Sequence, residues 1–254
     1  MRDVSLEPVT PVTPRPVRRA LLGQRWASVT FLHWPLDPAL AAPLLPAGTA
    51  PDTFDGVTYV GLIAFRMEDV LQAPYFGRFP ETNVRLYSVD SQGRRGVVFL
   101  SMEASRLVPV LVARATLGLP YRWSRMRLIR EGDDVSYSTR RRWGLRAGSD
   151  MTIRVGSPVT DPTPLELFLT ARWGLHTRAR YLSNEHPPWP LHRASVVSLT
   201  DGLVAATGLP APAGPPVSVL YSPGVSAVFG PTASGRGSTA SGRGPTASGR
   251  SRRR

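Results

Sequence analysis

The stretch Thr82-Asn-Val-Arg-Leu-Tyr-Ser-Val-Asp-Ser-Gln-Gly-Arg-Arg-Gly-Val-Val-Phe-Leu-Ser-Met-Glu103 carries the clearest fold signal in the chain. Two runs rich in β-branched and aromatic residues flank Asp90-Ser-Gln-Gly-Arg94, whose residue types favour a short loop. Two strands joined by such a loop pair antiparallel. The stretch therefore predicts a β-hairpin with strands over residues 82–89 and 96–103.

Similar strand signals recur along the chain. A second hairpin is predicted over residues 122–142, with Glu131-Gly-Asp-Asp134 as its loop. Further strands are predicted at residues 26–34, 57–65, 151–155, 177–182, 194–199 and 217–221. Helices are predicted only at residues 38–45, 106–117 and 163–173, from apolar spacing or N-cap residues. Many strands with about three short helices indicate an α+β domain that is mainly a curved antiparallel β-sheet or barrel.

The two ends of the chain differ in composition from the middle. Residues 1–21 are polar and spaced by prolines, so we expect a disordered, mobile leader. Residues 22–230 show no linker, so a single domain is predicted there. Residues 231–254 repeat Thr-Ala-Ser-Gly-Arg and contain six arginines and no acid. Such a segment has little apolar surface to bury, and we expect it to be a disordered tail.

Two absences from the composition exclude whole classes of chemistry. All 31 basic residues besides the histidines are arginine, and the chain has no lysine and no cysteine. A lysine imine, a lysine-containing phosphate loop, a disulfide and a thiol nucleophile are therefore excluded, and no cofactor is predicted. The histidines at 176, 186 and 192 are spaced too far apart for a compact metal motif, so no metal is predicted. No run of about 18 apolar residues is present, which predicts no membrane span and a cytoplasmic protein.

The first hairpin also holds the best candidate site. The polar side chains of Glu81, Asn83, Arg85 and Tyr87 alternate with Thr82, Val84, Leu86 and Ser88, so the polar set lies on one face of its strand. On an outer face they would simply meet water. Inside a barrel, the carboxylate, amide and guanidinium would converge on a cavity, as in many small-molecule sites. Glu103 is a further candidate, because two carboxylates facing across the ladder would raise one pKa.

Two other features suggest binding. His33 precedes Pro35, which would end the first strand and could turn the imidazole towards a cavity mouth. The second hairpin contains an arginine-rich set that could bind a carboxylate or phosphate. Its interleaved aromatic residues, together with the basic ends of the chain, keep nucleic-acid binding as an alternative. That set comprises Arg122, Arg125, Arg127, Arg130, Arg140, Arg141 and Arg142.

Several motifs occur in an order that resembles a known bacterial family. They are Trp26-Ala-Ser-Val-Thr-Phe-Leu-His-Trp-Pro35, Asp52-Thr-Phe-Asp-Gly56, Phe79-Pro-Glu-Thr-Asn-Val-Arg-Leu-Tyr87, Ala113-Arg-Ala-Thr-Leu-Gly-Leu-Pro-Tyr121, Pro187-Pro-Trp-Pro-Leu191 and Tyr221-Ser-Pro-Gly-Val225. Together they resemble the domain of unknown function 2071 over about residues 22–228. That family is similar in turn to the acetoacetate decarboxylase superfamily, which implies a curved β-barrel around a small cavity. It also implies that Glu81 corresponds to a glutamate of the decarboxylase pocket.

The resemblance also marks a departure from decarboxylase chemistry. Where acetoacetate decarboxylases have Gly-Phe-Pro and two lysines, one of which forms the imine, this chain has Gly118-Leu-Pro120 followed by Tyr121 and Arg122. The imine mechanism therefore cannot operate with these residues.

The sequence predicts instead a cavity that binds a small, anionic organic molecule. Arg85 and Arg122 would hold a carboxylate, Glu81 would be an acid or base, and Tyr121 would donate a proton, its pKa lowered by Arg122. Non-covalent lyase, isomerase or hydrolase chemistry on an enolisable acid is an alternative, as is a non-catalytic sensor whose cavity is filled by side chains. The sequence leaves open whether the protein is an enzyme and whether it forms homo-oligomers.

Overall fold

The computed structural model describes residues 5–70, 78–107 and 118–232, and all its strands belong to one hydrogen-bonded sheet. The predicted α+β class with a mainly antiparallel, curved sheet is confirmed. The strands are β1 (Leu22–Leu36), β2 (Thr49–Pro51), β3 (Thr58–Val70), β4 (Phe79–Asp90), β5 (Arg95–Ala104), β6 (Tyr121–Glu131), β7 (Asp134–Arg141), β8 (Gly148–Pro158), β9 (Gly174–His176), β10 (Tyr181–Glu185), β11 (His192–Asp201) and β12 (Ser218–Phe229).

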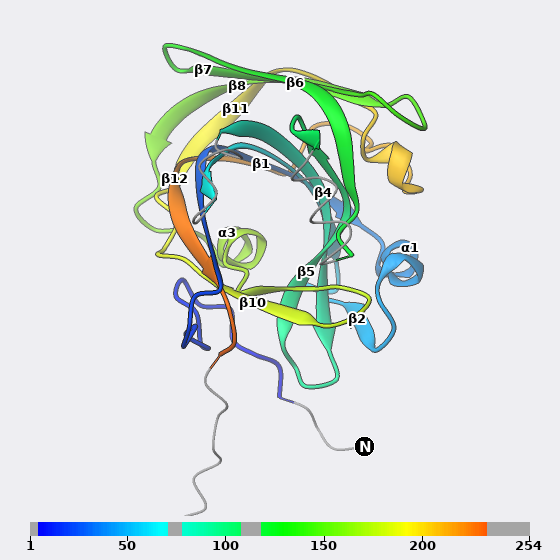
Figure 1. Cartoon of the computed structure of the whole chain (residues 1–254), viewed down its shortest axis with the longest axis vertical. Helices are drawn as coiled ribbons and strands as arrows, with labels where there is room; N and C mark the ends of the chain where they lie inside the picture. Colours follow the sequence, from blue (N-terminus) through cyan, green and yellow to red (C-terminus); the bar gives the residue numbers. More distant parts are fainter. Residues whose placement is uncertain (1–4, 71–77, 108–117, 233–254) are drawn as a thin grey trace, which may run out of the picture.

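A closed ring of paired strands forms the barrel (Figure 1). In order around it lie β12, β1, β3, β4, β5, β9 and β10, and β10 pairs back to β12. The remaining long strands β6, β7, β8 and β11 form a second layer on one side of this ring, joined to it at β5 and β12. Among the strands of the described residues, the pairings of β5 with β6 and with β9 are parallel and the others are antiparallel.

Both predicted hairpins are confirmed. Asp90 ends β4, and its side chain accepts hydrogen bonds from the backbone N–H groups of Gln92 and Arg94. Gly93 has a φ of 75°, which a residue without a Cβ adopts at little cost. The β6–β7 hairpin turns at Gly132, whose φ is 62°.

The main apolar core lies between the ring and the second layer. Leu62 and Val84 project from the ring and pack against Val135 and Ile153 of the second layer, and all four are fully buried. Because side chains alternate along β4, the residues next to Val84 project to the opposite face, into the ring. This core therefore decides which residues of β4 border the barrel interior.

The helices are short. α1 (Pro38–Ala41) is capped by Asp37 and continues as a 3₁₀ turn, and a second 3₁₀ turn spans Ala205–Thr207. α3 (Pro164–Thr170) begins with the reciprocal pair of hydrogen bonds of a capping box, between Thr163 and Glu166. It lies within the outline of the ring in Figure 1 and packs Phe168 and Leu169 onto β4 and β9. The helix predicted over residues 106–117 falls mainly on residues 108–117, outside the described part.

The segment before β1 contacts the barrel. Arg15 donates to Glu7 and to the phenol oxygen of Tyr181, and the N–H of Val17 donates to Glu185. Arg15 and Val17 thus contact β10, and a mobile leader over residues 1–21 stays a prediction. Most of the predicted tail, residues 233–254, lies outside the described residues. In the part described, no helix is long and apolar enough to cross a membrane.

Candidate functional site

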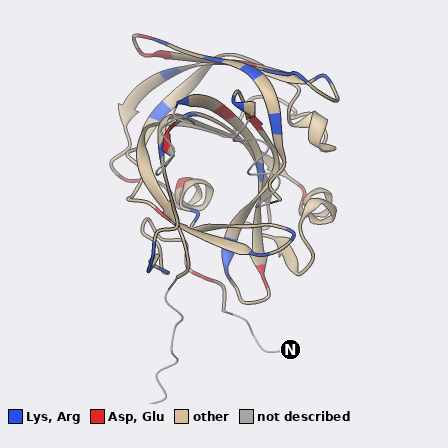
Figure 2. Ribbon diagram, in the orientation of Figure 1, with Lys and Arg blue, Asp and Glu red and all other residues tan. Residues whose placement is uncertain are grey.

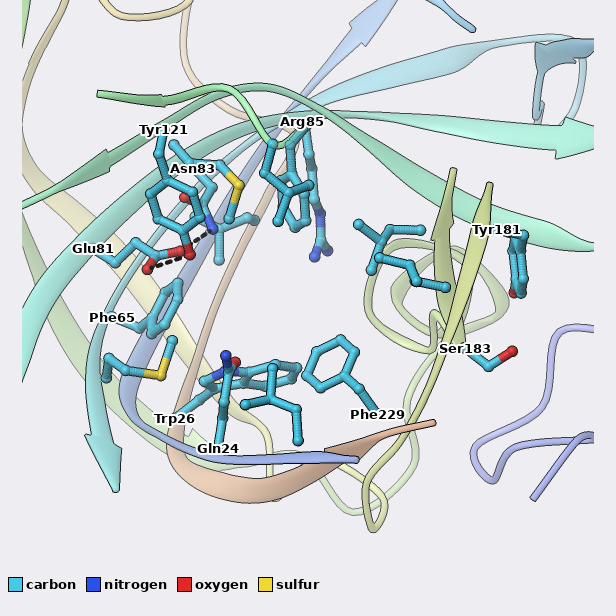
Figure 3. Close-up of a pocket in the computed structure, with 18 of the residues that line it drawn as sticks. Gln24, Trp26, Phe65, Glu81, Asn83, Arg85, Tyr121, Tyr181, Ser183 and Phe229 are labelled. Atoms are coloured by element: carbon cyan, nitrogen blue, oxygen red, sulfur yellow. Dashed lines mark hydrogen bonds between the residues drawn. The ribbon is translucent and has the colours of Figure 1, made fainter. Parts of the chain in front are cut away.

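The barrel interior contains a cavity of about 940 Å³. Its wall is mostly aromatic and aliphatic, with contributions from β1, β3, β4, β5, β6, β9, β10 and β12. Figure 3 shows Glu81, Asn83 and Tyr121 converging on one side, with Tyr181 and Ser183 on the opposite side. The apolar side chains that line it include Trp26, Val29, Phe31, Ile63, Phe65, Met67, Phe79, Phe99, Met102, Leu119, Leu175, Leu182, Trp189 and Phe229.

Glu81 is the acid of this cavity and is only 1% exposed. Its Oε1 accepts from Asn83 Nδ2 at 3.0 Å, and its Oε2 accepts from the Tyr121 hydroxyl at 3.2 Å. Burial raises the pKa of Glu81 from 4.5 to about 7, although both hydrogen bonds act in the opposite direction. The carboxyl group therefore changes protonation state close to neutral pH, as a general acid or base must.

The expected pairing of Glu81 with Glu103 is wrong. Glu81 lies opposite Ala104 in the β4–β5 ladder, and Glu103 lies opposite Thr82, so the two carboxylates are on different faces of the sheet. Glu103 is fully buried outside the cavity lining, where it accepts from Ser101, Ser124 and Arg141. The raised pKa of Glu81 comes from burial and not from a second carboxylate.

The expected roles of Tyr121 and Arg122 also need correction. Tyr121 lines the cavity, but burial and the neighbouring Glu81 raise the pKa of its phenol well above 10. Arg122 follows it in β6 and therefore projects to the other face, where it is exposed and outside the cavity lining. The phenol is accordingly a neutral hydrogen-bond donor, and Arg122 does not acidify it.

Arg85 presents a cation to the cavity and is fixed by two groups behind it. Its Nε and Nη2 donate to the hydroxyl of Tyr87 at 3.3 and 3.1 Å, and Nη2 also donates to the carbonyl of Leu169 in α3 at 2.8 Å. Its guanidinium carbon lies 5.8 Å from the centroid of the Phe31 ring. Within the described residues, no carboxylate lies at ion-pairing distance from Arg85, and its Nη1 has no hydrogen-bond partner.

His33 supports this arrangement from behind rather than lining the cavity as expected. It is fully buried, and its Nε2 lies 2.7 Å from the Tyr87 hydroxyl. Burial, and then the charges of Arg85 and Arg172, hold its pKa well below the usual range, so the imidazole is neutral. Gly61 lies opposite His33 in the ladder, and a Cβ there would come within 3.2 Å of the His33 ring and 3.3 Å of the Arg85 side chain, so a larger residue would need both to shift by a few tenths of an ångström.

A buried ion pair completes the support and was not anticipated. Arg172 follows α3, pairs with Asp52 and lies over the Tyr87 ring at 4.7 Å. Tyr87 continues the alternation of Glu81, Asn83 and Arg85, so the two-residue period of the strand already placed it on the same face as these residues. Nothing in the sequence indicates that Asp52 and Arg172, far apart in the chain, would meet.

The other sequence features do not form a site of their own in the described residues. Three arginines of the second hairpin have separate partners: Arg130 donates to the Tyr221 hydroxyl, Arg140 pairs with Asp150 and Arg141 pairs with Glu103. Figure 2 shows basic and acidic residues interspersed over this outer layer. Among the described side chains, no group of three or more His, Asp and Glu has the arrangement of a metal site.

The fold and cavity define a barrel of the acetoacetate decarboxylase-like class. The structure of acetoacetate decarboxylase from Legionella pneumophila is similar with a TM-score of 0.56, at 16% identity, over 87% of this chain and 88% of that one. The enduracididine biosynthesis enzyme MppR, complexed with pyruvate, is similar with a TM-score of 0.55, at 15% identity, over 83% of this chain and 88% of that one. At such identities the likeness establishes the fold alone.

Sequence comparison establishes the family. Residues 23–226 match the DUF2071 family, described as an uncharacterized conserved protein. The uncharacterized protein YqjF of Bacillus subtilis (strain 168) is 30% identical over 209 residues, which cover 78% of this chain and 86% of YqjF. The chain belongs to the DUF2071 family, as the motifs in the sequence indicated.

Proposed function

We propose that the cavity binds a small organic acid, with the carboxylate of the ligand on Arg85 and its apolar body among the aromatic side chains. The observation that carries this proposal is Arg85, a cation on the wall of an apolar cavity with no counter-charge at ion-pairing distance in the described residues. Removing a charge from water is costly unless it is paired. An anion that entered the cavity would supply the missing partner.

The support behind Arg85 favours this use. Tyr87 and Leu169 occupy Nε and Nη2, and Nη1 is left without a partner in the described part of the chain. A guanidinium with a fixed plane binds a carboxylate with defined geometry. Among the described residues, the charged groups that line the cavity are Glu81 and three arginines, at 85, 94 and 180. Arg94 is paired with Asp90, so Arg85 and Arg180 give the lining its excess of positive charge, which favours an anion.

The volume and lining indicate the kind of acid. A cavity of about 940 Å³ lies at the upper end of the roughly 300–1,000 Å³ typical of sites for drug-sized ligands. An acid of three or four carbons would leave most of it empty, so the ligand we propose has a bulky apolar body. MppR, with a similar fold, has been solved with pyruvate, which is also a carboxylic acid. The chain has no lysine, so binding here involves no lysine imine.

A titration with a matched acid and amide tests the proposal. Trp26 and Trp189 line the cavity, so their fluorescence reports occupancy by 4-phenylbutanoate or by the neutral 4-phenylbutanamide. We expect the acid to bind at least tenfold more tightly than the amide, and Arg85→Met to abolish that preference. Arg122→Met is the matched control, because Arg122 is exposed outside the cavity lining. Equal binding of the acid by wild type and Arg85→Met would refute the proposal.

A second function, proton transfer on an enolisable acid, is favoured by Glu81. Its pKa of about 7 suits a general acid or base, and Tyr121 beside it is a neutral donor that could stabilise an enolate. The test is exchange of the carbon-bound hydrogens next to the carbonyl of 2-oxo-4-phenylbutanoate in D₂O, followed by NMR. We expect wild type to accelerate this exchange and Glu81→Gln to lose the acceleration. Exchange at the rate of buffer alone would assign the cavity to binding only.

A further inference from the structure

Asn83 is a buried polar group in the cavity, and among the described residues only one end of its side-chain amide has a hydrogen-bond partner. It is 4% exposed and lies in β4 between Glu81 and Arg85, on the same face as both. Its Nδ2 donates to Glu81 Oε1 at 3.0 Å. Its Oδ1 has no hydrogen-bond partner in the described part of the chain. A buried acceptor left without a donor is unfavourable, because it has lost its hydrogen bonds to water and gained none in return.

The neighbours of Asn83 determine which end of the amide faces Glu81. An ionised carboxylate can only accept hydrogen bonds, and both oxygens of Glu81 already have donors, from Asn83 and from the Tyr121 hydroxyl. When Glu81 is ionised, the amide therefore turns its Nδ2 to Glu81, as the structure shows, and Oδ1 is left as the acceptor without a partner among the described residues. A ligand that supplies a donor at this position would satisfy that acceptor.

We propose that Asn83 makes the cavity selective for acids that carry a hydroxyl group close to the carboxylate. This inference rests on the proposed function, since the carboxylate of the ligand is taken to lie on Arg85. Asn83 and Arg85 are two residues apart on one strand, a rise of about 7 Å. Both side chains line the cavity, so with the carboxylate on Arg85 we place the hydroxyl for Oδ1 on the second or third carbon of the acid. The apolar body then extends towards Trp26 and Phe229.

The same geometry disfavours an oxo group at that position. A carbonyl oxygen is an acceptor only and would face Oδ1, another acceptor. A methylene group would leave Oδ1 as it is, without a donor. The expected order of affinity is therefore hydroxy acid first, with the unsubstituted acid and the oxo acid both weaker.

Four acids with one carbon skeleton test this order. They are 2-hydroxy-4-phenylbutanoate, 4-phenylbutanoate, 2-oxo-4-phenylbutanoate and 2-amino-4-phenylbutanoate, titrated calorimetrically at pH 8.5, where Glu81 is ionised. We expect the hydroxy acid to bind about tenfold more tightly than the unsubstituted acid, which corresponds to about 1.4 kcal/mol. Asn83→Leu should remove this ratio. Ser183→Ala, which alters a hydroxyl on the opposite side of the cavity, should keep it.

The outcomes separate this inference from the function on which it rests. If all four acids bind equally and Arg85→Met weakens them all, the role of Asn83 is refuted and the function stands. If none binds, or Arg85→Met changes nothing, the proposed function itself fails. If 2-amino-4-phenylbutanoate binds most tightly, the proposed selectivity for a hydroxyl group is refuted and an ammonium group is the preferred donor to Asn83. If circular dichroism shows that Asn83→Leu does not fold, the ratio of the wild-type affinities for the hydroxy acid and the unsubstituted acid still tests the proposal, and a ratio near one refutes it.

Discussion

Replacing Glu81 by glutamine should make the protein more stable at alkaline pH. Burial raises the pKa of this carboxyl group from 4.5 to about 7 in the folded state. Each pKa unit corresponds to about 1.4 kcal/mol, so ionised Glu81 costs the folded state about 3 kcal/mol. Glutamine keeps the shape of the protonated acid and removes that cost. Loss of an ion pair cannot offset the gain, because no cation pairs with Glu81 among the described residues.

The sign of the pH dependence follows from proton linkage. Between pH 4.5 and 7 the folded state keeps the proton on Glu81 and the unfolded state releases it. The contribution of Glu81 to the free energy of unfolding is therefore fully present below pH 4.5 and is lost as the pH rises through 7. Burial lowers the pKa of His186 to about 4, which acts in the opposite direction. That effect is common to wild type and variant and cancels in their difference.

Urea unfolding of both proteins at half-unit intervals from pH 5 to pH 8.5 measures this difference. We expect the two free energies to be similar at pH 5 and Glu81→Gln to be about 3 kcal/mol more stable at pH 8.5. Glu103→Gln is the contrasting control, since Glu103 is fully buried but paired with Arg141. Removing one partner of such a pair should destabilise the fold by about 3–5 kcal/mol. Parallel curves for wild type and Glu81→Gln would refute the reasoning.

Two further predictions concern the support behind Arg85. Tyr87→Phe removes the hydroxyl oxygen that accepts hydrogen bonds from Nε and Nη2 of Arg85. Binding of 4-phenylbutanoate should therefore weaken about tenfold, while binding of its neutral amide stays unchanged. Equal weakening of both would assign Tyr87 a structural role only. Asp52→Asn leaves Arg172 buried without its counter-charge, and calorimetric or urea unfolding should show a loss of about 3–5 kcal/mol. A loss below 1 kcal/mol would show that the pair is not needed to hold α3 against Tyr87.

Local sequence determined most of the long strands and placed the candidate site residues of β4 on one face; it missed the short β2 and β9, and the strand predicted at residues 177–182 begins at Tyr181. Turn residues at Asp90–Arg94 and Glu131–Asp134 define both hairpins, because turn propensity acts over a few residues. The two-residue period of a strand puts Glu81, Asn83 and Arg85 on one face wherever the strand lies. The ordered motifs identified the family, and the absence of lysine excluded a lysine imine.

Only the tertiary structure decided that the face of β4 with Glu81, Asn83 and Arg85 borders the cavity. Both faces of β4 are buried, so the two-residue period alone could not show which face borders the cavity and which packs in the core. The register was equally undetermined, since a shift of one residue between β4 and β5 would place Glu103 instead of Ala104 opposite Glu81. The carbonyl of Leu169 that fixes Arg85, and the Asp52–Arg172 pair behind Tyr87, join residues more than eighty positions apart. Such contacts form because ring closure through β9 and β10 brings distant segments together, and no local pattern encodes that closure.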